Sequence, residues 1–214
     1  MKQETFFTSD THFGQIKVVR QRWQAGKHPF KSIEEHDEYL INRWNAIVPS
    51  NGIVYHLGDF AFGHKEYVHQ IRQRLNGQVF LVRGNHDTRI PKKTFGWVKD
   101  YYKVRIPDET LSKGRAKIIL SHYPILSFQH QHKGAWHLFG HSHSNANQWI
   151  DKHLPEARIL DAGVENWDYA PVPYHVVKEY MIDKKGQFVD HHNNDPKPVT
   201  VDLLFGAENL ELHS

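Results

Sequence analysis

The sequence of 214 residues contains no cysteine. Disulfide bonds and thiolate metal sites are therefore excluded, so any metal ion must be held by imidazole, carboxylate or amide groups. Long apolar runs are also missing: the chain opens with MKQETFFTSD, where polar residues return after two phenylalanines. We expect neither a signal peptide nor a membrane span from this pattern, and we predict a soluble, cytoplasmic protein.

A strong excess of one charge is absent as well. The chain carries 27 Lys and Arg against 24 Asp and Glu, so its basic balance favours phosphate groups without identifying nucleic acid as a partner. The 39% hydrophobic and 24% charged content is typical of a folded globular protein. We predict one domain over residues 1–182 and a polar C-terminal extension over 183–214, packed on the domain or partly disordered. Nothing in the sequence indicates an oligomeric state.

Short apolar runs alternate with helical patterns in the first half of the chain. The pattern predicts strands within 4–9, 52–60 and 78–87, and helices over 32–48 and 64–75, the first with a capping box of Ser32 and Glu35. Three more apolar runs follow at 116–122, 136–143 and 157–163 without long helices between them. This order favours an α/β sandwich with a mixed sheet.

Polar side chains follow five of these predicted strands directly. Each one alone is more often a turn or capping residue than a ligand. Five such clusters are hard to explain in that way, because the carboxyl ends of parallel strands line one edge of a sheet and bring the clusters together. The clusters are Asp10 and His12; Asp59; Asn85, His86 and Asp87; His122; and His141 and His143.

Histidine is abundant, with 18 residues, and it is the commonest neutral metal ligand. Imidazole, carboxylate and amide groups without sulfur suit divalent manganese, iron, zinc, cobalt or nickel. Six or more potential ligands exceed the needs of one tetrahedral ion. We therefore predict two ions that share a carboxylate, about 3.5–4 Å apart.

The ordered pattern resembles the signature of the calcineurin-like metallophosphoesterases. It comprises Asp10-x-His12, Gly58-Asp59, Gly84-Asn85-His86-Asp87, His122 and Gly140-His141-x-His143. The runs TSDTHFG and VYHLGDF further resemble small bacterial and phage members. The resemblance covers residues 10–143, about two-thirds of the chain, and implies a four-layer αββα sandwich of two mixed β-sheets.

The same resemblance implies a role for each position. One ion would be bound by Asp10, His12 and His143, the other by Asn85, His122 and His141, with Asp59 bridging both. The ions are expected to be manganese, with iron, zinc, nickel or cobalt as alternatives. His86 would face the substrate and Asp87 would orient the His86 imidazole. Relatives often carry His where Gln15 stands, which leaves the role of position 15 open.

Two arginines flank the Asn-His-Asp turn. Arg83 and Arg89 are predicted to contact a substrate phosphate, against the alternative that both are solvated surface residues.

The function that the resemblance implies is a dinuclear metal-dependent phosphoesterase, with diesters slightly favoured, that uses in-line attack by a hydroxide bridging the ions.

Two alternatives stay open at this point. A nuclease, with a nucleotide or nucleic acid as substrate, is favoured if basic residues of 89–93 and 98–105 form a stripe beside the site. A non-catalytic protein-binding scaffold on the same fold is the other, and the presence of His86 and of every metal position argues against it.

Overall fold

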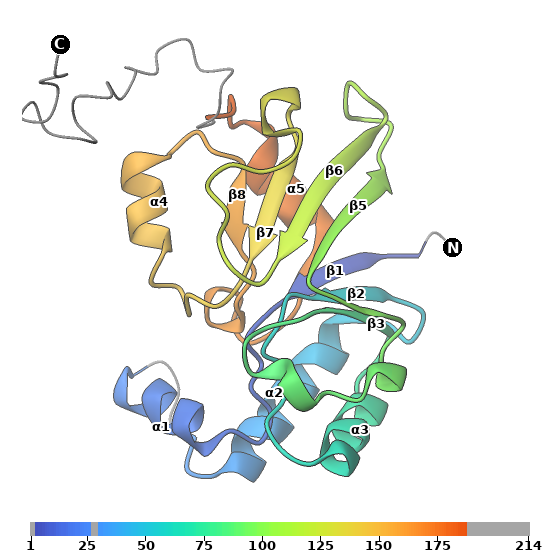
Figure 1. Ribbon diagram of the computed structural model, residues 1–214, viewed down its shortest axis with the longest axis vertical. Coiled ribbons are helices and arrows are strands. Elements are labelled where there is room, and N and C mark those ends of the chain that lie inside the picture. The colour runs from blue at the N-terminus through green and yellow to red at the C-terminus, as the bar shows by residue number, and fades with distance from the viewer. Residues whose placement is uncertain (1–2, 27–29, 188–214) are drawn as a thin grey trace, which may run out of the picture.

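Two β-sheets and five α-helices make up the part of the chain that the computed structural model describes, residues 3–26 and 30–187 (Figure 1). The helices are α1 (Ile16–Gln24), α2 (Ile33–Ile47), α3 (Lys65–Arg74), α4 (Asn147–His153) and α5 (Tyr174–Ile182). The strands are β1 (Thr5–Thr8), β2 (Ile53–His56), β3 (Gln78–Val82), β4 (Val98–Lys99), β5 (Tyr101–Pro107), β6 (Arg115–Ser121), β7 (Trp136–Phe139), β8 (Ile159–Asp161) and β9 (Val172–Pro173).

Both sheets are mixed. The first has the order β4-β3-β2-β1-β9, in which β1 to β4 are parallel and β9 is antiparallel to β1. The second has the order β5-β6-β7-β8, in which β6, β7 and β8 are parallel and β5 is antiparallel to β6. The carboxyl ends of β1, β2 and β3 therefore share one edge of the first sheet, and those of β6, β7 and β8 share one edge of the second.

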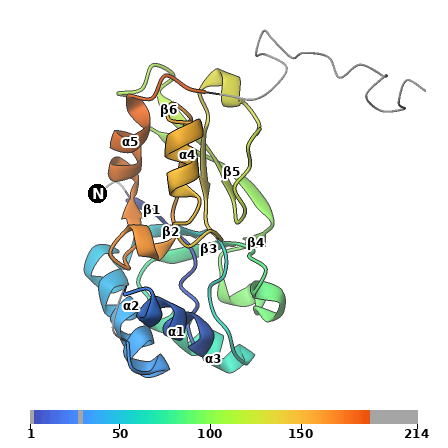
Figure 2. The ribbon, with the colours of Figure 1, turned by 90° about the vertical axis from the view of Figure 1, so that its left-hand side faces the viewer.

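Three apolar layers fill the space between the sheets and helices. The first lies between one face of the first sheet and helices α1, α2 and α3, and includes Phe6, Leu40, Trp44 and Leu81. The second lies between the two sheets and receives Val177 of α5. The third joins the outer face of the second sheet to α4 and the loop before β7. The chain is thus an α/β sandwich in which helices cover both sheets, as the turned view shows (Figure 2).

The strands and the two long helices predicted from the sequence are confirmed within a few residues. Ser32 accepts a hydrogen bond from the backbone N–H of Glu35, while the Glu35 carboxylate reaches the N–H of Lys31. Helices α1, α4 and α5 and strands β4, β5 and β9 were not predicted. Helix α1 has a polar sequence and no side-chain cap, so local sequence signals did not mark it.

The predicted extension begins where α5 ends. Residues 183–187 turn back on the segment after α4: the Arg158 guanidinium donates to the Lys184 carbonyl at 2.9 and 2.7 Å, and Gly186 N–H donates to the Glu156 carbonyl at 3.0 Å. Residues 188–214 lie outside the described residues, so the boundary at 182 stays a prediction. Among the described residues, no helix combines the length and the apolar character needed to cross a bilayer.

Candidate metal centre

The predicted ligands meet where the carboxyl ends of both sheets come together. The two sheets are joined there by a parallel bridge between Ser9, just past β1, and Gly163, just past β8. Two groups of three ligand side chains form at this junction, with the ligand atoms of each group within 4.8 Å of one another. The first group is Asp10, His12 and His143, and the second is Asp59, His122 and His141.

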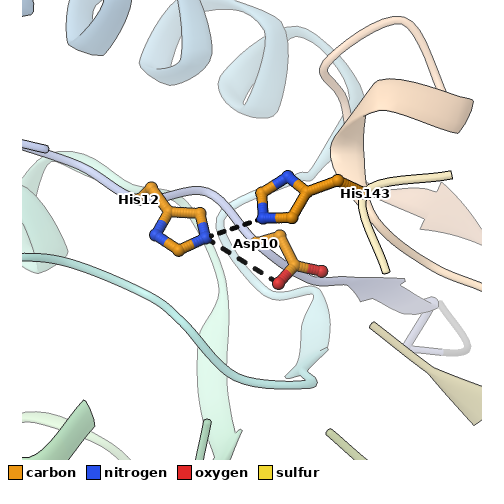
Figure 3. A group of neighbouring side chains, drawn as sticks. All are labelled: Asp10, His12 and His143. Atoms are coloured by element: carbon orange, nitrogen blue, oxygen red, sulfur yellow. Dashed lines mark hydrogen bonds and ion pairs between the residues drawn. The ribbon is translucent and has the colours of Figure 1, made fainter. Parts of the chain in front are cut away.

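The first group combines residues from the beginning and from the end of the sequence signature. The ring nitrogen Nε2 of His12 lies 3.9 Å from Asp10 Oδ1 and 3.2 Å from His143 Nε2 (Figure 3). Asp10 and His12 follow β1, whereas His143 comes from the loop after β7, 131 residues further along than His12. The sandwich therefore brings residues of two different sheets to one point.

The second group is built in the same way from β2, β3, β6 and β7. His122 Nε2 lies 3.0 Å from Asn85 Oδ1, and the rings of His122 and His141 are 5.0 Å apart. Asn85 thus places an amide oxygen beside this group, and its role as a ligand stays a prediction.

Asp59 lies between the two groups. Its Oδ2 is 3.6 Å from His12 Nε2 and also 3.6 Å from His122 Nε2. Its other oxygen, Oδ1, accepts the backbone N–H of His86 at 2.8 Å and is fixed by it. One carboxylate oxygen equidistant from both groups is the arrangement needed to bridge two cations.

Three of the histidines have their ring protons fixed by neighbouring acceptors. Nδ1 of His12 donates to Gln15 Oε1, Nδ1 of His122 to the Leu57 carbonyl at 2.9 Å, and Nδ1 of His143 to Glu165 Oε1 at 2.7 Å. In a neutral imidazole with Nδ1 protonated, Nε2 carries a lone pair. The lone pairs of His12 and His143 therefore face each other at 3.2 Å and require a cation between them.

The carboxylate of Asp10 tests whether that cation is a metal ion. Asp10 is fully buried, and its Oδ1 has no hydrogen-bond partner among the described residues. Its Oδ2 accepts the backbone N–H of His141 at 2.9 Å. Burial raises the pKa of Asp10 well above its ordinary value and lowers that of His12, because neither charged form is solvated there. An unpaired buried oxygen beside two imidazole lone pairs fits a divalent cation.

The backbone is strained at the same positions. Asp10, His12, Asp59, His141 and His143 all have positive φ, between 49° and 67°, in a region that non-glycine residues rarely occupy. Five of the nine described non-glycine residues with positive φ are thus predicted ligands. Strain of about 1–3 kcal/mol per residue persists only where surrounding contacts impose it, and it gathers at functional sites.

Two glycines allow the loops to approach this closely. A Cβ on Gly140 would lie 1.9 Å from Ser9 Oγ and 2.6 Å from Asp10 Oδ2. A Cβ on Gly84 would lie 2.2 Å from Asp59 Oδ1. Neither position tolerates a side chain while the ligands keep their places.

A buried ion pair that sequence reasoning missed holds the first group. The Glu165 side chain is 1% exposed, and its Oε1 accepts from His143 Nδ1 and from Arg22 Nε at 2.9 Å. Burial alone would raise the pKa of Glu165, but the Arg22 guanidinium and His143 hold it below its usual range. A carboxylate behind a metal-binding histidine fixes the ring and increases its basicity.

Arg22 connects this pair to the strained loop. Its guanidinium donates to the backbone carbonyls of Asp10 at 2.6 Å and Thr11 at 3.2 Å, and also contacts His36 Nε2. The Arg22 side chain is 2% exposed although it lies on a helix rich in polar residues. No local pattern marked Arg22 or Glu165, because neither directly follows a strand. A fully buried arginine needs the fold to reveal its partners.

Position 15, left open from the sequence, contacts a ligand. Gln15 is buried, and its amide oxygen accepts the Nδ1 proton of His12. Gln15 therefore supports the His12 ring as Glu165 supports the His143 ring, with a neutral acceptor in place of a charged one.

His86 differs from the ligands in its exposure. Its side chain is solvent-exposed, and its ring lies edge-on to His12 with centroids 5.4 Å apart. It lines an open cavity of about 910 Å³ together with Phe62, Lys65 and Thr88. This placement leaves the imidazole free to meet a molecule bound at the metal centre.

The prediction that Asp87 orients His86 is wrong. The Asp87 carboxylate is buried and accepts the backbone N–H groups of Asp59 at 2.8 Å, Phe60 at 2.9 Å and Gly84 at 2.8 Å. Both oxygens are thus engaged by the two loops that carry Asp59 and Asn85. Asp87 clamps these loops because a buried carboxylate needs hydrogen-bond donors, and the backbone supplies them.

The two arginines of the Asn-His-Asp turn have different outcomes. Arg83 forms an ion pair of 3.1 Å with Asp100 and lines a hollow of about 400 Å³ with Asn85 and His122. It is thus near the centre but already has an anionic partner. The side chain of Arg89 lies outside what the structure describes, so its predicted role stays a prediction.

Comparison with known proteins adds relatives but no shared function. No protein-family model matches the chain. An uncharacterised protein of Methanocaldococcus jannaschii is 28% identical over 87% of this chain and 95% of its own length. The gene 66 protein of Mycobacterium phage L5 is 26% identical over 76% of this chain and 87% of its own length. These matches make the chain similar to small archaeal and phage proteins of about its own size.

Solved structures support the fold. A protein of unknown function from Aquifex aeolicus superposes with a TM-score of 0.62 at 24% identity, covering 83% of this chain and 99% of that one. A Streptococcus pneumoniae protein described as a predicted phosphoesterase reaches a TM-score of only 0.29 at 20% identity, over 67% of this chain and 64% of its own. The first shows a shared fold, and the second is too distant to carry an argument.

Proposed function

We propose that the protein is a dinuclear metal-dependent phosphoesterase of the calcineurin-like type. The observation that carries this proposal is the position of Asp59, whose Oδ2 lies 3.6 Å from a ring nitrogen in each of two ligand groups. Two adjacent cations that share a carboxylate suit phosphoryl transfer, since they clamp the attacking and leaving oxygens of an in-line displacement.

The residues divide into ligands of the ions and residues that hold the ligand loops in place. Asp10, His12 and His143 would hold one ion, and Asn85, His122 and His141 the other, with Asp59 shared. Such ions, when bound, would neutralise phosphate oxygens and make water a nucleophile at neutral pH. The loops that carry these ligands are fixed in advance by Asp87, so little reorganisation is needed during reaction.

His86 is the residue proposed to act on the substrate directly. Its imidazole is exposed beside His12 and faces a cavity large enough for a substituent of the phosphate ester. It would donate a hydrogen bond or a proton to the leaving oxygen, which typically contributes on the order of a hundred to ten thousandfold in rate.

Diesters are favoured by the two separate hollows that residues of the centre line. One cavity is lined by His86 and a separate hollow is lined by Asn85 and His122, with no residue in common. A phosphodiester has two ester substituents, one for each hollow. A monoester would leave one of these hollows empty.

Two variants test these assignments. His86→Ala should retain both metal ions and lose on the order of a hundredfold or more in turnover of bis(p-nitrophenyl) phosphate with manganese. Asp59→Asn should weaken both ions together, because the bridging charge is removed. Metal content by elemental analysis and turnover are measured on the same samples. If His86→Ala loses metal while activity per bound metal is unchanged, the assignment of His86 is wrong.

The protein-binding scaffold is the second candidate. It would need the ligand set as a structural feature only, which does not explain an exposed His86 facing a cavity. Failure of every phosphate ester, both mono- and diesters, with each of the five candidate metals supplied would favour the scaffold.

A further inference from the structure

A row of exposed cations covers the outer face of the β5–β6 hairpin. Arg105 and Lys117 stand directly opposite each other in the register of the two strands. Lys103 and Arg115 lie two residues away along their strands, so all four side chains share the face that points away from the core between the sheets. Like charges directly opposite each other destabilise a sheet, so a bound anion would offset a cost that the fold otherwise carries.

The cations continue into a hollow at the far end of β6. Its volume is about 310 Å³, and five of its lining residues are basic. These are Lys113, Arg115, Lys117, Lys133 and Arg158. We use the name cationic face for Lys103, Arg105, Lys113, Arg115, Lys117 and Lys133. Within residues 3–26 and 30–187, no member of the cationic face forms an ion pair with a carboxylate.

Of the two acidic residues in the hairpin turn, Asp108 and Glu109, the first is paired with residues outside the cationic face. Asp108 pairs with Lys178 of α5 at 3.0 Å and accepts the Tyr174 hydroxyl at 2.8 Å. On the cationic face, partial desolvation and then the charges of neighbours such as Arg115 lower the pKa of Lys117. The face therefore has positive charge in excess of its own counter-charges.

Two exposed tyrosines lie between the metal centre and the cationic face. Tyr101 is 42% exposed and Tyr123 is 50% exposed, and both line the hollow of about 400 Å³ that contains Asn85 and His122. The ring of Tyr123 is 4.6 Å from that of His141. Tyr123 thus borders the metal centre.

Gln129 shows that this hollow continues into the cationic face. Its backbone N–H donates a hydrogen bond to the Tyr101 hydroxyl, and its side-chain oxygen accepts one from Lys103 Nζ at 3.0 Å. Tyr101 and Lys103 stand on the same face of β5, since side chains alternate along a strand. Strand β6 runs from Arg115 to Ser121, the residue before His122, a length of about 20 Å. A continuous path therefore leads from the ligand His122 along the hairpin.

We propose that this path binds a single strand of nucleic acid, with bases on the two tyrosines and phosphates along the cationic face. The proposal deepens the proposed function, on which it rests, by naming the substrate class of the metal centre. Exposed aromatic rings next to a basic groove favour a single strand, because only unpaired bases offer their faces for stacking. The cations need no base sequence, so binding should depend weakly on sequence.

Binding is tested without catalysis. Chelator-treated protein is titrated into a fluorescein-labelled single-stranded DNA, and the fluorescence anisotropy is followed. The DNA has about 12 nucleotides, a length within the usual site size of proteins that bind single strands. If about five phosphates are neutralised, the logarithm of affinity should fall against the logarithm of salt concentration with a slope of about −3 to −4.

Charge reversal localises the contact. The double variant R105E/K117E keeps like charges opposite each other, so the sheet retains its native repulsion. It should bind at least about tenfold more weakly, and its salt slope should fall by about 1.4 because two phosphate contacts are lost. The control R20E/K152E makes the same change of net charge on exposed positions of α1 and α4 and should bind nearly as native. Tyr101→Ala should weaken binding about 5- to 100-fold through lost stacking.

Specific results would overturn the proposal. One is that R105E/K117E binds the oligonucleotide as tightly as the native protein, and another is that R20E/K152E loses as much affinity as R105E/K117E. The others are duplex binding at least as tight as single-strand binding, and displacement of the oligonucleotide by vesicles of phosphatidylcholine and phosphatidylserine. A thermal melt reports whether each variant is folded. Binding with no turnover of bis(p-nitrophenyl) phosphate in the native protein would reject the proposed function alone. Turnover without binding would reject only the nucleic-acid path.

Discussion

Replacing Glu165 by glutamine isolates the buried carboxylate behind His143. The substitution keeps the size of the side chain and an oxygen that accepts from His143 Nδ1, but removes the charge that faces Arg22. Both partners of the ion pair are almost fully buried, at 2% and 1% exposure. Removing one charge of such a pair costs about 3–5 kcal/mol, because the other charge stays buried without compensation.

The effect on metal binding follows from the same contact. With a neutral acceptor behind it, the His143 ring is less basic and less firmly oriented, so affinity for the first ion should fall by about 10–100-fold. That loss corresponds to about 1.4–2.7 kcal/mol. The second ion, held by His122, Asn85 and His141, should be affected much less.

The chain offers a matched control in an exposed pair of the same kind. Glu38 binds Arg74 through two hydrogen bonds of 2.7 Å, but its side chain is 53% exposed. Glu38→Gln should lower stability by less than about 1 kcal/mol and leave metal affinity unchanged. Urea unfolding in chelator and manganese titration by calorimetry give both quantities for each variant.

Two outcomes would refute this reasoning. If Glu165→Gln binds manganese as tightly as the native protein, the carboxylate does not support the ligand through His143. If its unfolding free energy falls no more than that of Glu38→Gln, the Arg22 pair is not the buried charge pair that the structure shows.

Three further predictions concern stability and loop approach. Burial lowers the pKa of His56 to about 3 and that of His137 to about 4, below the pKa of histidine in the unfolded chain. The stability that these two neutral side chains provide is therefore complete above about pH 6.5 and is lost as the pH decreases below that value. Urea unfolding of the chelator-treated protein at pH 5 should show a free energy of unfolding lower by about 2 kcal/mol per group than at pH 7. An unchanged free energy of unfolding would contradict this prediction. The variant His69→Gln, at an exposed histidine, serves as the control. Arg105→Glu alone should stabilise the sheet by about 0.2–1 kcal/mol, since it places opposite charges face to face with Lys117, and a lower melting temperature would oppose the repulsion argument. Gly140→Ala should displace Asp10 and weaken the first ion at least about tenfold in a metal titration, whereas native affinity would show that the loop can yield.

Strand-end chemistry was readable from the sequence because it is local. A short apolar run followed at once by Asp, Asn or His places that side chain at the carboxyl edge of a parallel sheet, whatever the rest of the chain does. All seven predicted ligand positions lie at this edge, six of them in the two groups of three and Asn85 beside the second group. The mixed α/β architecture followed from the same alternation of runs.

Roles that depend on distant partners were not readable. Asp87 stands beside His86 in the sequence, yet its carboxylate turns to three backbone N–H groups, two of them 27 and 28 residues away. Sequence neighbours need not face each other, and a buried carboxylate takes the donors that the fold provides.

The sequence by itself determined which ligand types were present, their order and the exclusion of sulfur. The tertiary structure alone decided that Arg22 and Glu165 support His143, and that Arg105 and Lys117 stand opposite each other. The physical reason is that local patterns fix what one strand or helix presents, whereas ion pairing and strand register are set by contacts between segments far apart in the chain.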